Sequence, residues 1–119
     1  MGLTKVKVSI SNPRLPKKKV ALNFLVDSGA AYSVVPRAKL QKLGIKPESK
    51  ESFFLANGEE ISRDMGNALF QFRGRRRASP VIFGEIGDSN LLGVVTLEAL
   101  GFVLDPLRRE LKPLPMLLM

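Results

Sequence analysis

The first part of the chain alternates between polar and apolar residues with a period of two. Residues 3–10 and 19–26 both show this alternation. In the second segment, the apolar residues that share one face are Val20, Leu22, Phe24 and Val26. Because successive side chains of a strand point to opposite faces, the pattern predicts two strands. Between them, residues 12–16 hold two prolines and an asparagine and are expected to form a turn or loop.

Two short segments carry helix signals instead. Residues 36–43 open with Pro36, which suits the first helical position because its missing N–H would be unpaired there anyway. Gly44 follows, and glycine commonly ends a helix in the left-handed conformation. A second short helix is expected at roughly 94–100, with Gly101 as its stop.

The middle of the chain predicts hairpins. Asn57-Gly58 lies at the centre of residues 51–66, and Asn-Gly is the strongest short hairpin signal because both turn residues need positive φ. A further alternating segment follows, and residues 76–83 are expected to return as the next strand. Pro80 places that strand at an edge or makes it irregular, because proline cannot donate to the ladder.

Two last strands are expected at 102–104 and 110–112, around a turn at Asp105-Pro106. Because proline and glycine divide the chain into short segments at fairly regular spacing, we predict an all-β protein with one or two short helices. With 119 residues, the chain is expected to form one domain over 1–119. No run has the apolar core of a signal peptide or the length of a transmembrane helix, so a soluble, cytoplasmic protein without membrane contact is expected.

The chain has no cysteine and no histidine. The first absence excludes disulfides, thiolate metal sites and a cysteine nucleophile. The second excludes Ser-His-Asp catalysis, zinc–histidine sites and imidazole acid–base chemistry. An enzyme built from this chain must use carboxylates, lysine, Tyr32, hydroxyls or backbone groups. No carboxylate cluster has metal-loop spacing and no glycine loop suits phosphate, so neither a metal nor a cofactor is expected.

The net charge of +8 raises the question of an anionic partner. The basic residues cluster at 17–19, 73–77 and 108–112. We interpret these clusters as solvated hairpin tips and edge strands, where positive charge also discourages edge-to-edge aggregation. No aromatic residues interleave with the arginines as stacking platforms would, which disfavours nucleic acid as a partner.

A short polar turn follows a hydrophobic run. Phe24-Leu25-Val26 leads into Asp27-Ser28-Gly29. Asp-Ser-Gly alone is a weak signal, because many turns use these residues for local hydrogen bonding and positive φ. Its surroundings strengthen it. Ala30 comes next, the apolar segment 33–36 leaves the turn as a second buried strand, and Leu91-Leu92-Gly93 later precedes the second predicted helix.

From Asp27 to Leu104, this combination resembles the retropepsin-type aspartic proteases. The family signature is a hydrophobic pair and Asp-Thr/Ser-Gly-Ala, followed later by two aliphatic residues and a glycine before the C-terminal helix. The segments 27–30 and 91–93 match it directly. The segment 104–113 resembles small bacterial and archaeal members better than viral ones. The resemblance implies a retropepsin-like acid-protease β-barrel half that works as a homodimer on polypeptide substrates.

The resemblance also implies roles for individual residues. Asp27 would be catalytic. The residues that would support the active-site loop are Ser28, Gly29, Ala30, Leu91, Leu92 and Gly93. The flap that closes over the substrate would include Leu55, Ala56, Asn57, Gly58 and Glu59. There are departures: Ser28 stands where threonine is more common, the helix at 36–43 is absent from the smallest viral enzymes, and the flap tip has one glycine.

One chain supplies one such aspartate, whereas the chemistry of the family needs two. Twofold symmetry would bring Asp27 of each subunit to the axis. The apolar segment 115–119 would then lie in the dimer interface, where the chain ends interleave in this family.

Two other readings stay open. The chain could keep the fold but serve as a binding or regulatory module that cleaves little. Less favoured is a basic nucleic-acid-binding β-barrel in which Asp-Ser-Gly is only a turn. The cluster at 73–77 is the only feature that favours this last reading.

Overall fold

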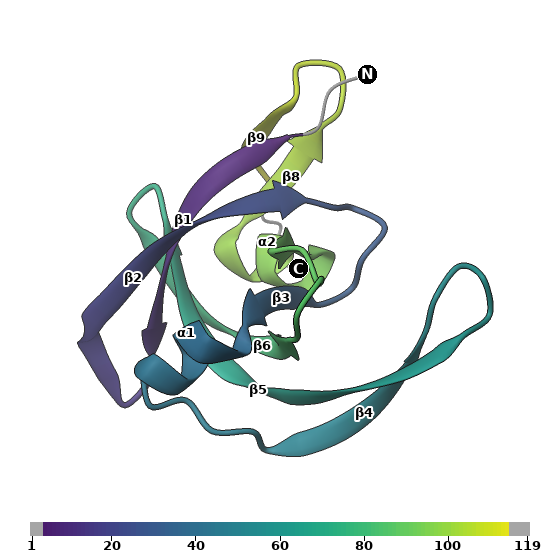
Figure 1. The fold of residues 1–119 in the computed structure, drawn as a ribbon. Helices are drawn as coiled ribbons and strands as arrows, with labels where there is room; N and C mark the ends of the chain where they lie inside the picture. The colour runs from purple at the N-terminus through teal and green to yellow at the C-terminus, as the bar shows by residue number, and fades with distance from the viewer. Residues whose placement is uncertain (1–3, 115–119) are drawn as a thin grey trace, which may run out of the picture.

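The computed structural model describes residues 4–114 of the chain (Figure 1). Its elements, in chain order, are β1 (Lys5–Asn12), β2 (Leu15–Val26), β3 (Ser33–Pro36), α1 (Arg37–Lys42), β4 (Ser49–Phe54), β5 (Glu60–Phe72), β6 (Arg75–Gly84), β7 (Leu91–Leu92), α2 (Val94–Leu100), β8 (Phe102–Asp105) and β9 (Glu110–Pro113). The predicted all-β fold with short helices is therefore confirmed. The segment 115–119, expected at a dimer interface, lies outside the described residues.

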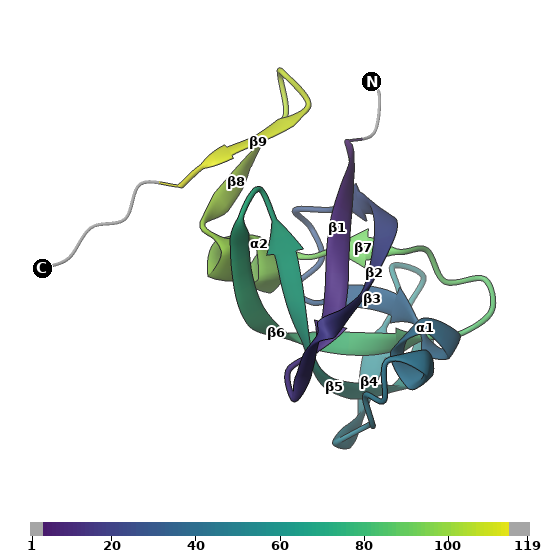
Figure 2. The ribbon, with the colours of Figure 1, turned by 90° about the vertical axis from the view of Figure 1, so that its left-hand side faces the viewer.

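Most of the strands form one sheet that curls on itself. Its order is β1-β2-β7-β3-β6-β5-β4, and an additional antiparallel pairing joins β1 to β5. The sheet therefore closes on itself around a core, while β4 remains at an edge. The two strands β8 and β9 form a separate two-stranded sheet, whose turn projects at one end of the molecule (Figure 2).

The core is built from the faces that the alternation predicts. On β2, Phe24 and Val26 are buried, and Val20 and Leu22 pack against the core from its margin. The largest fully buried side chains include Phe24, Phe70 and Phe83, which come from three different strands. Burying one such side chain contributes about 1.5–3 kcal/mol, so these residues hold the sheet in its curled form.

Both helices lie where the sequence predicts them. α1 begins one residue later than predicted, because Pro36 is its N-cap residue with an extended backbone (ψ 136°), and Gly44 follows the end of the helix with φ of 77°. α2 ends at Gly101, whose φ of 82° is left-handed. In both places, the glycine adopts the conformation that an L side chain disfavours.

The Asn57-Gly58 hairpin forms, but the predicted turn type is wrong. Gly58 has a φ of 89°, whereas Asn57 is not among the residues with positive φ. The loop is longer than two residues: Leu55 N–H donates to the Glu59 carbonyl (2.8 Å), and Asn57 Oδ1 accepts from Glu59 N–H (2.9 Å). The hydrogen bond to the Asn57 side chain thus stabilises this longer loop, and the tight type I′ turn does not form.

The strand that contains Pro80 is not an edge strand, because β6 lies between β3 and β5. Pro80 pairs with Asn67 on β5, and the pairing with β3 begins one residue later, at Val81. At Pro80 the strand therefore has a paired neighbour on one side only. This is the local condition under which a sheet tolerates proline.

Candidate active site

Asp27 lies immediately after β2, where the chain leaves the sheet (Figure 1). Its backbone N–H donates to the Leu92 carbonyl oxygen on β7 (3.1 Å). Just before it, β2 and β7 run parallel, with Val26 opposite Leu92. The two segments that the sequence singles out are therefore adjacent, and the second fixes where the first ends.

The Asp-Ser-Gly turn is closed by the aspartate itself. Asp27 Oδ1 accepts from Gly29 N–H (2.8 Å), and the Asp27 carbonyl accepts from Ala30 N–H (3.2 Å). Asp27 is half-buried, whereas Ser28 and Gly29 are exposed. Among the described residues, Oδ1 is the only oxygen of this carboxylate with a hydrogen-bond partner. The turn thus presents a carboxylate edge at the surface.

Gly93 lies directly against the loop that follows the turn. A β-carbon at this position would come within 2.6 Å of the Tyr32 carbonyl carbon and oxygen, a contact that real structures do not tolerate. The next two residues continue the contact, because Val94 N–H donates to Ala30 and Val95 N–H to Ala31, each at 2.9 Å. Only glycine permits this approach.

A chain of buried hydroxyls lies behind the same loop, and sequence reasoning missed it. Thr96 Oγ1 lies 2.6 Å from Ser33 Oγ and 2.8 Å from Ser79 Oγ. Ser33 Oγ also accepts from Gly93 N–H (3.0 Å). The available signal was a polar residue on the buried face of an apolar segment, as Ser33 is beside Val34 and Val35. The chain links β3, β6 and α2 beneath residues 27–32.

A cavity of about 560 Å³ opens between this loop and the β4–β5 hairpin. Its lining comes from the loop, the hairpin, β3, β6 and the segment before β7: Ala30, Ala31, Tyr32, Val34, Phe53, Phe54, Leu55, Ile61, Arg63, Ile82, Gly87, Asp88, Ser89 and Leu91. Of the predicted flap residues, only Leu55 lines it. Asp27 is not among the lining residues, so in the single chain the carboxylate lies beside the cavity and not within it.

An ion pair closes part of the cavity wall. Arg63 Nε donates to Asp88 Oδ2 (2.9 Å) and Arg63 Nη2 to Asp88 Oδ1 (3.1 Å). These hydrogen bonds lower the pKa of Asp88 and raise the pKa of Arg63. Asp88 Oδ2 also accepts from Glu85 N–H (2.8 Å). The pair therefore joins β5, at the base of the hairpin, to the loop that leads into β7.

A second ionic group lies next to this loop. Arg37 contacts Asp64 (2.7 Å) and Glu85 (2.8 Å), and its guanidinium carbon lies 5.1 Å from the centre of the Phe83 ring. The hydrogen bond from Arg37 lowers the pKa of Glu85. α1, β5 and the end of β6 are thus connected on the outer side of the cavity.

The sequence predicts a solvated hairpin tip for the cluster at 73–77, and the structure gives two of its arginines another role. Arg73 lies 4.9 Å from the Phe72 ring and donates to the Leu111 carbonyl (3.1 Å). Arg75 lies 5.1 Å from the Phe102 ring and donates to the carbonyls of residues 100 and 101 (3.2 Å each). These arginines hold the β8–β9 hairpin and the end of α2, which weakens the case for a nucleic-acid surface there.

Over residues 4–114, no group of three or more His, Cys, Asp or Glu side chains is arranged to hold a metal ion. No helix in this range is long and apolar enough to cross a membrane.

Comparisons with known proteins give one family match and several structural matches. Residues 6–96 match a family model described as aspartyl protease. No curated protein is detectably similar to the chain. Among solved structures, the EIAV protease aligns with a TM-score of 0.63 at 21% identity, covering 84% of this chain and 89% of the viral one.

Two further solved structures align. The simian foamy virus (mac) protease has a TM-score of 0.53 at 22% identity, covering 78% of this chain and 92% of its own. A retropepsin-like aspartic protease from Rickettsia conorii has a TM-score of 0.47 at 20% identity, with coverages of 88% and 89%.

Proposed function

The chain belongs to the aspartyl protease family and has the retropepsin-like fold of the viral proteases, and from this premise we propose that it is a homodimeric aspartic endopeptidase, with Asp27 of each subunit as the catalytic carboxylate. The observation that carries the proposal is the position of Asp27 on an exposed turn whose backbone is fixed to Leu92. A single domain over 1–119 would form one half of the enzyme.

The need for a partner follows from the chemistry. Hydrolysis of a peptide bond requires a base that activates water and an acid that protonates the carbonyl oxygen. Two carboxylates held close together cannot both ionise, so they share one proton and supply both groups, which is the established behaviour of aspartic proteases in general. Each chain contributes one Asp-Ser-Gly turn, so a twofold dimer would complete the pair.

The proposed reaction balances without a cofactor. The ionised carboxylate of the pair accepts a proton from water as the water oxygen bonds to the carbonyl carbon, and the protonated one donates to the carbonyl oxygen. When the C–N bond breaks, one carboxyl donates its proton to the leaving nitrogen, and the other carboxylate accepts a proton from a hydroxyl of the tetrahedral intermediate as the C=O bond re-forms, so that the pair again holds one proton. The pair titrates as a unit, so the proton is not assigned to either subunit.

The remaining residues would position this pair and the substrate. Ser28 and Gly29 lie on the exposed side of the turn, where the opposite loop would approach. Leu91, Leu92 and Gly93 would support the turn from beneath. The segment 55–59 would close over an extended substrate and exclude water from the cavity.

Cleavage of an unfolded protein tests the proposal. Wild-type protein should cleave such a substrate between pH 3 and 8, a transition-state-mimicking aspartic protease inhibitor should block it, and Asp27→Asn should abolish it. Asp105→Asn is the matched control, because Asp105 Oδ1 also closes a turn by accepting from a backbone N–H, that of Leu107. Activity retained by Asp27→Asn would refute the assignment.

The alternative is a binding or regulatory module with the same fold. Sedimentation of the same samples shows whether the protein is a dimer and, together with the cleavage assay, distinguishes the peptidase from the module. A folded dimer that cleaves nothing under any of these conditions would favour the module, whereas Asp27-dependent cleavage would eliminate it.

A further inference from the structure

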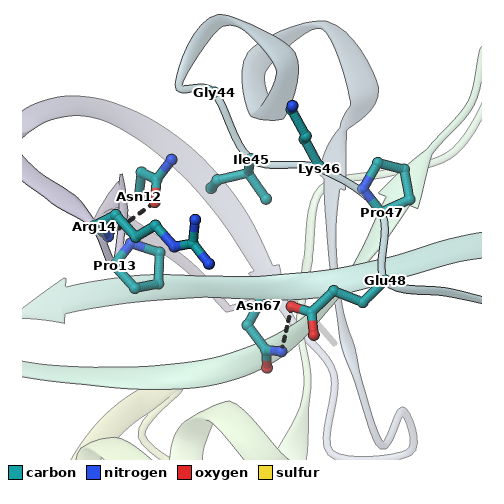
Figure 3. Close-up of a pocket in the computed structure, with 9 residues that line it drawn as sticks. All are labelled: Asn12, Pro13, Arg14, Gly44, Ile45, Lys46, Pro47, Glu48 and Asn67. Atoms are coloured by element: carbon teal, nitrogen blue, oxygen red, sulfur yellow. Dashed lines mark hydrogen bonds between the residues drawn. The ribbon is translucent and has the colours of Figure 1, made fainter.

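Seven basic side chains gather at one end of the molecule. They come from the β1–β2 turn, the start of β2, α1 and the loop after α1: Arg14, Lys17, Lys18, Lys19, Lys39, Lys42 and Lys46. They line three adjoining cavities of about 500, 420 and 260 Å³, of which the first two share Arg14 and the last two share Lys18. We call this surface the α1 basic face. Figure 3 shows Arg14 and Lys46 in its first cavity.

The α1 basic face holds most of the net charge of the chain. It carries seven of the 19 Lys and Arg residues but one of the 11 Asp and Glu residues, Glu48, which places six of the eight net charges here. Glu48 itself accepts a hydrogen bond from Asn67 Nδ2 (2.9 Å; Figure 3). The sequence alone does not reveal this concentration, because it shows only the run at 17–19.

Seven of the twelve basic residues elsewhere in the chain have a carboxylate or an aromatic ring as partner. Arg37, Lys50, Arg63, Arg108 and Lys112 contact carboxylates, and the arginines at 73 and 75 lie over aromatic rings. In the described part of the chain, none of the seven on the α1 basic face forms an ion pair. Clustered like charges repel one another over a screening length of about 8–10 Å, so this face carries an electrostatic cost that an anionic partner would relieve.

Local structure explains only part of the cluster. Lys18 Nζ donates to the Lys42 carbonyl at the end of α1 (3.0 Å), and Lys19 Nζ to Gln71 Oε1 (2.6 Å). Lys39 and Lys42 lie in the last turn of α1, where the helix dipole stabilises a positive charge. Arg14, Lys17 and Lys46 have no such role, because their side chains make no hydrogen bond within residues 4–114.

The chemistry of the α1 basic face favours a polypeptide over a nucleic acid. None of the residues that line its three cavities is aromatic, so bases would find no stacking platform. Apolar side chains lie beside the cations instead: Leu15 is 60% exposed at the start of β2, and the partly buried Val20 lines the neighbouring cavity. A surface of cations with some aliphatic area suits a segment rich in Asp and Glu with occasional aliphatic residues.

We propose that the α1 basic face binds an acidic segment of the polypeptide substrate, away from the bond that is cleaved. This inference rests on the proposed function, because it takes the bound polypeptide to be the substrate of the peptidase. In Figure 1, α1 and the β1–β2 turn lie at the end of the molecule opposite the tip of the β4–β5 hairpin. Lys18 lies near the start of β2 and Asp27 directly after its end, nine residues further along the chain, a path of about 30 Å at ~3.3 Å per residue. An extended polypeptide needs about as many residues to span this distance, so the acidic segment should lie about ten residues from the scissile bond.

A binding experiment that needs no catalysis tests the docking itself. The protein carries Asp27→Asn, and the probes are a fluorescent peptide of ten glutamates, its glutamine counterpart and a fluorescent DNA duplex. The triple variant Arg14→Glu, Lys17→Glu, Lys46→Glu should bind the glutamate peptide about tenfold more weakly or worse. The triple variant Lys7→Glu, Arg76→Glu, Arg77→Glu makes the same charge change at exposed positions outside the face and should retain binding.

Three results of this experiment would overturn the proposal: no binding of the glutamate peptide, equal loss in both triple variants, or tighter binding of the duplex. An equal loss of affinity in the two triple variants would show that the peptide responds only to the net charge of the protein. Tighter binding of the duplex would indicate a nucleic-acid surface. Because the protein is catalytically disabled by design, failure of the proposed function does not affect this result.

A cleavage experiment with active enzyme tests the role in substrate choice. Two peptides share one scissile sequence, and one of them carries an acidic segment about ten residues away. The acidic segment should raise kcat/KM for the wild type and the control variant, but not for the Arg14, Lys17, Lys46 variant. All three proteins should cleave the peptide without the segment equally. Equal kcat/KM for both peptides in active wild type would overturn the proposal.

Discussion

A β-carbon added to Gly93 would lie 2.6 Å from the Tyr32 carbonyl carbon and oxygen. This relationship joins the segment before α2 to the loop that carries the candidate aspartate, and nothing but backbone lies at the contact. A side chain at 93 cannot move out of the way, so the loop would have to move instead.

Gly93→Ala should therefore destabilise the fold by about 1–3 kcal/mol and lower peptidase activity more than the stability loss explains. The measurement is urea unfolding together with kcat/KM. Gly74→Ala is the control, because a β-carbon at Gly74 meets nothing within 4 Å and its cost comes from a φ of +78° alone. Equal activity in the two variants would show that the close approach at Gly93 does not shape the site.

The buried hydroxyl of Thr96 carries a second prediction. It lies within hydrogen-bond distance of both Ser33 and Ser79, and all three residues are buried. Thr96→Val keeps the shape but removes the shared partner, so we expect a loss of about 1–3 kcal/mol of unfolding free energy. Thr96→Ser, which keeps the hydroxyl, should lose clearly less. Equal loss in the two variants would assign the effect to packing instead.

The parts of the fold that sequence predicts are those that neighbouring residues determine. α2 and its end at Gly101 follow from an apolar segment and a glycine that takes positive φ. The turn at residue 57 differs from its prediction because the Asn57 side chain bonds to Glu59 and closes a longer loop. Pro80 lies on an internal strand because strand order depends on partners distant in sequence.

The same distinction applies to the candidate site. The motif around Asp27 is contiguous, and its later partner Leu92 is recognisable because both end hydrophobic runs. The Arg63–Asp88 pair spans 25 positions and the Ser33–Thr96 pair spans 63. Neither pair leaves a local pattern in the sequence, because one depends on how β5 and the loop before β7 align in the folded chain and the other on how β3 and α2 align.

The ion pairs beside the cavity make the stability of the fold depend on pH. Hydrogen bonds from Arg37 and Arg63 hold the pKa values of Glu85 and Asp88 below their ordinary values of 4.5 and 3.8. A carboxyl group with a lowered folded pKa stabilises the fold above its unfolded pKa, and this contribution is lost as pH falls through the folded pKa.

We therefore expect the wild type to lose more thermal stability between pH 5 and 3 than the double variant Glu85→Gln, Asp88→Asn, although other carboxylates titrate in both. The measurement is Tm at intervals across this range. At pH 7, the double variant should already be the less stable protein. Parallel curves for the two proteins would show that these pairs do not contribute.

The last prediction concerns what the cavity accepts. Arg63 is the cationic residue that lines it, and Asp88 neutralises Arg63 through two hydrogen bonds (2.9 and 3.1 Å). As long as the pair is intact, Arg63 has no free positive charge to bind an acidic side chain of the substrate, and the cavity should favour uncharged residues.

Asp88→Asn removes the negative charge and leaves Arg63 in place. We expect the variant to prefer a glutamate-containing peptide over its glutamine counterpart about tenfold more than the wild type does, equivalent to ~1.4 kcal/mol. The measurement is the ratio of kcat/KM for the two peptides, and Asp64→Asn, which removes a carboxylate outside the cavity, is the control. An unchanged ratio in Asp88→Asn would mean that Arg63 does not reach the substrate.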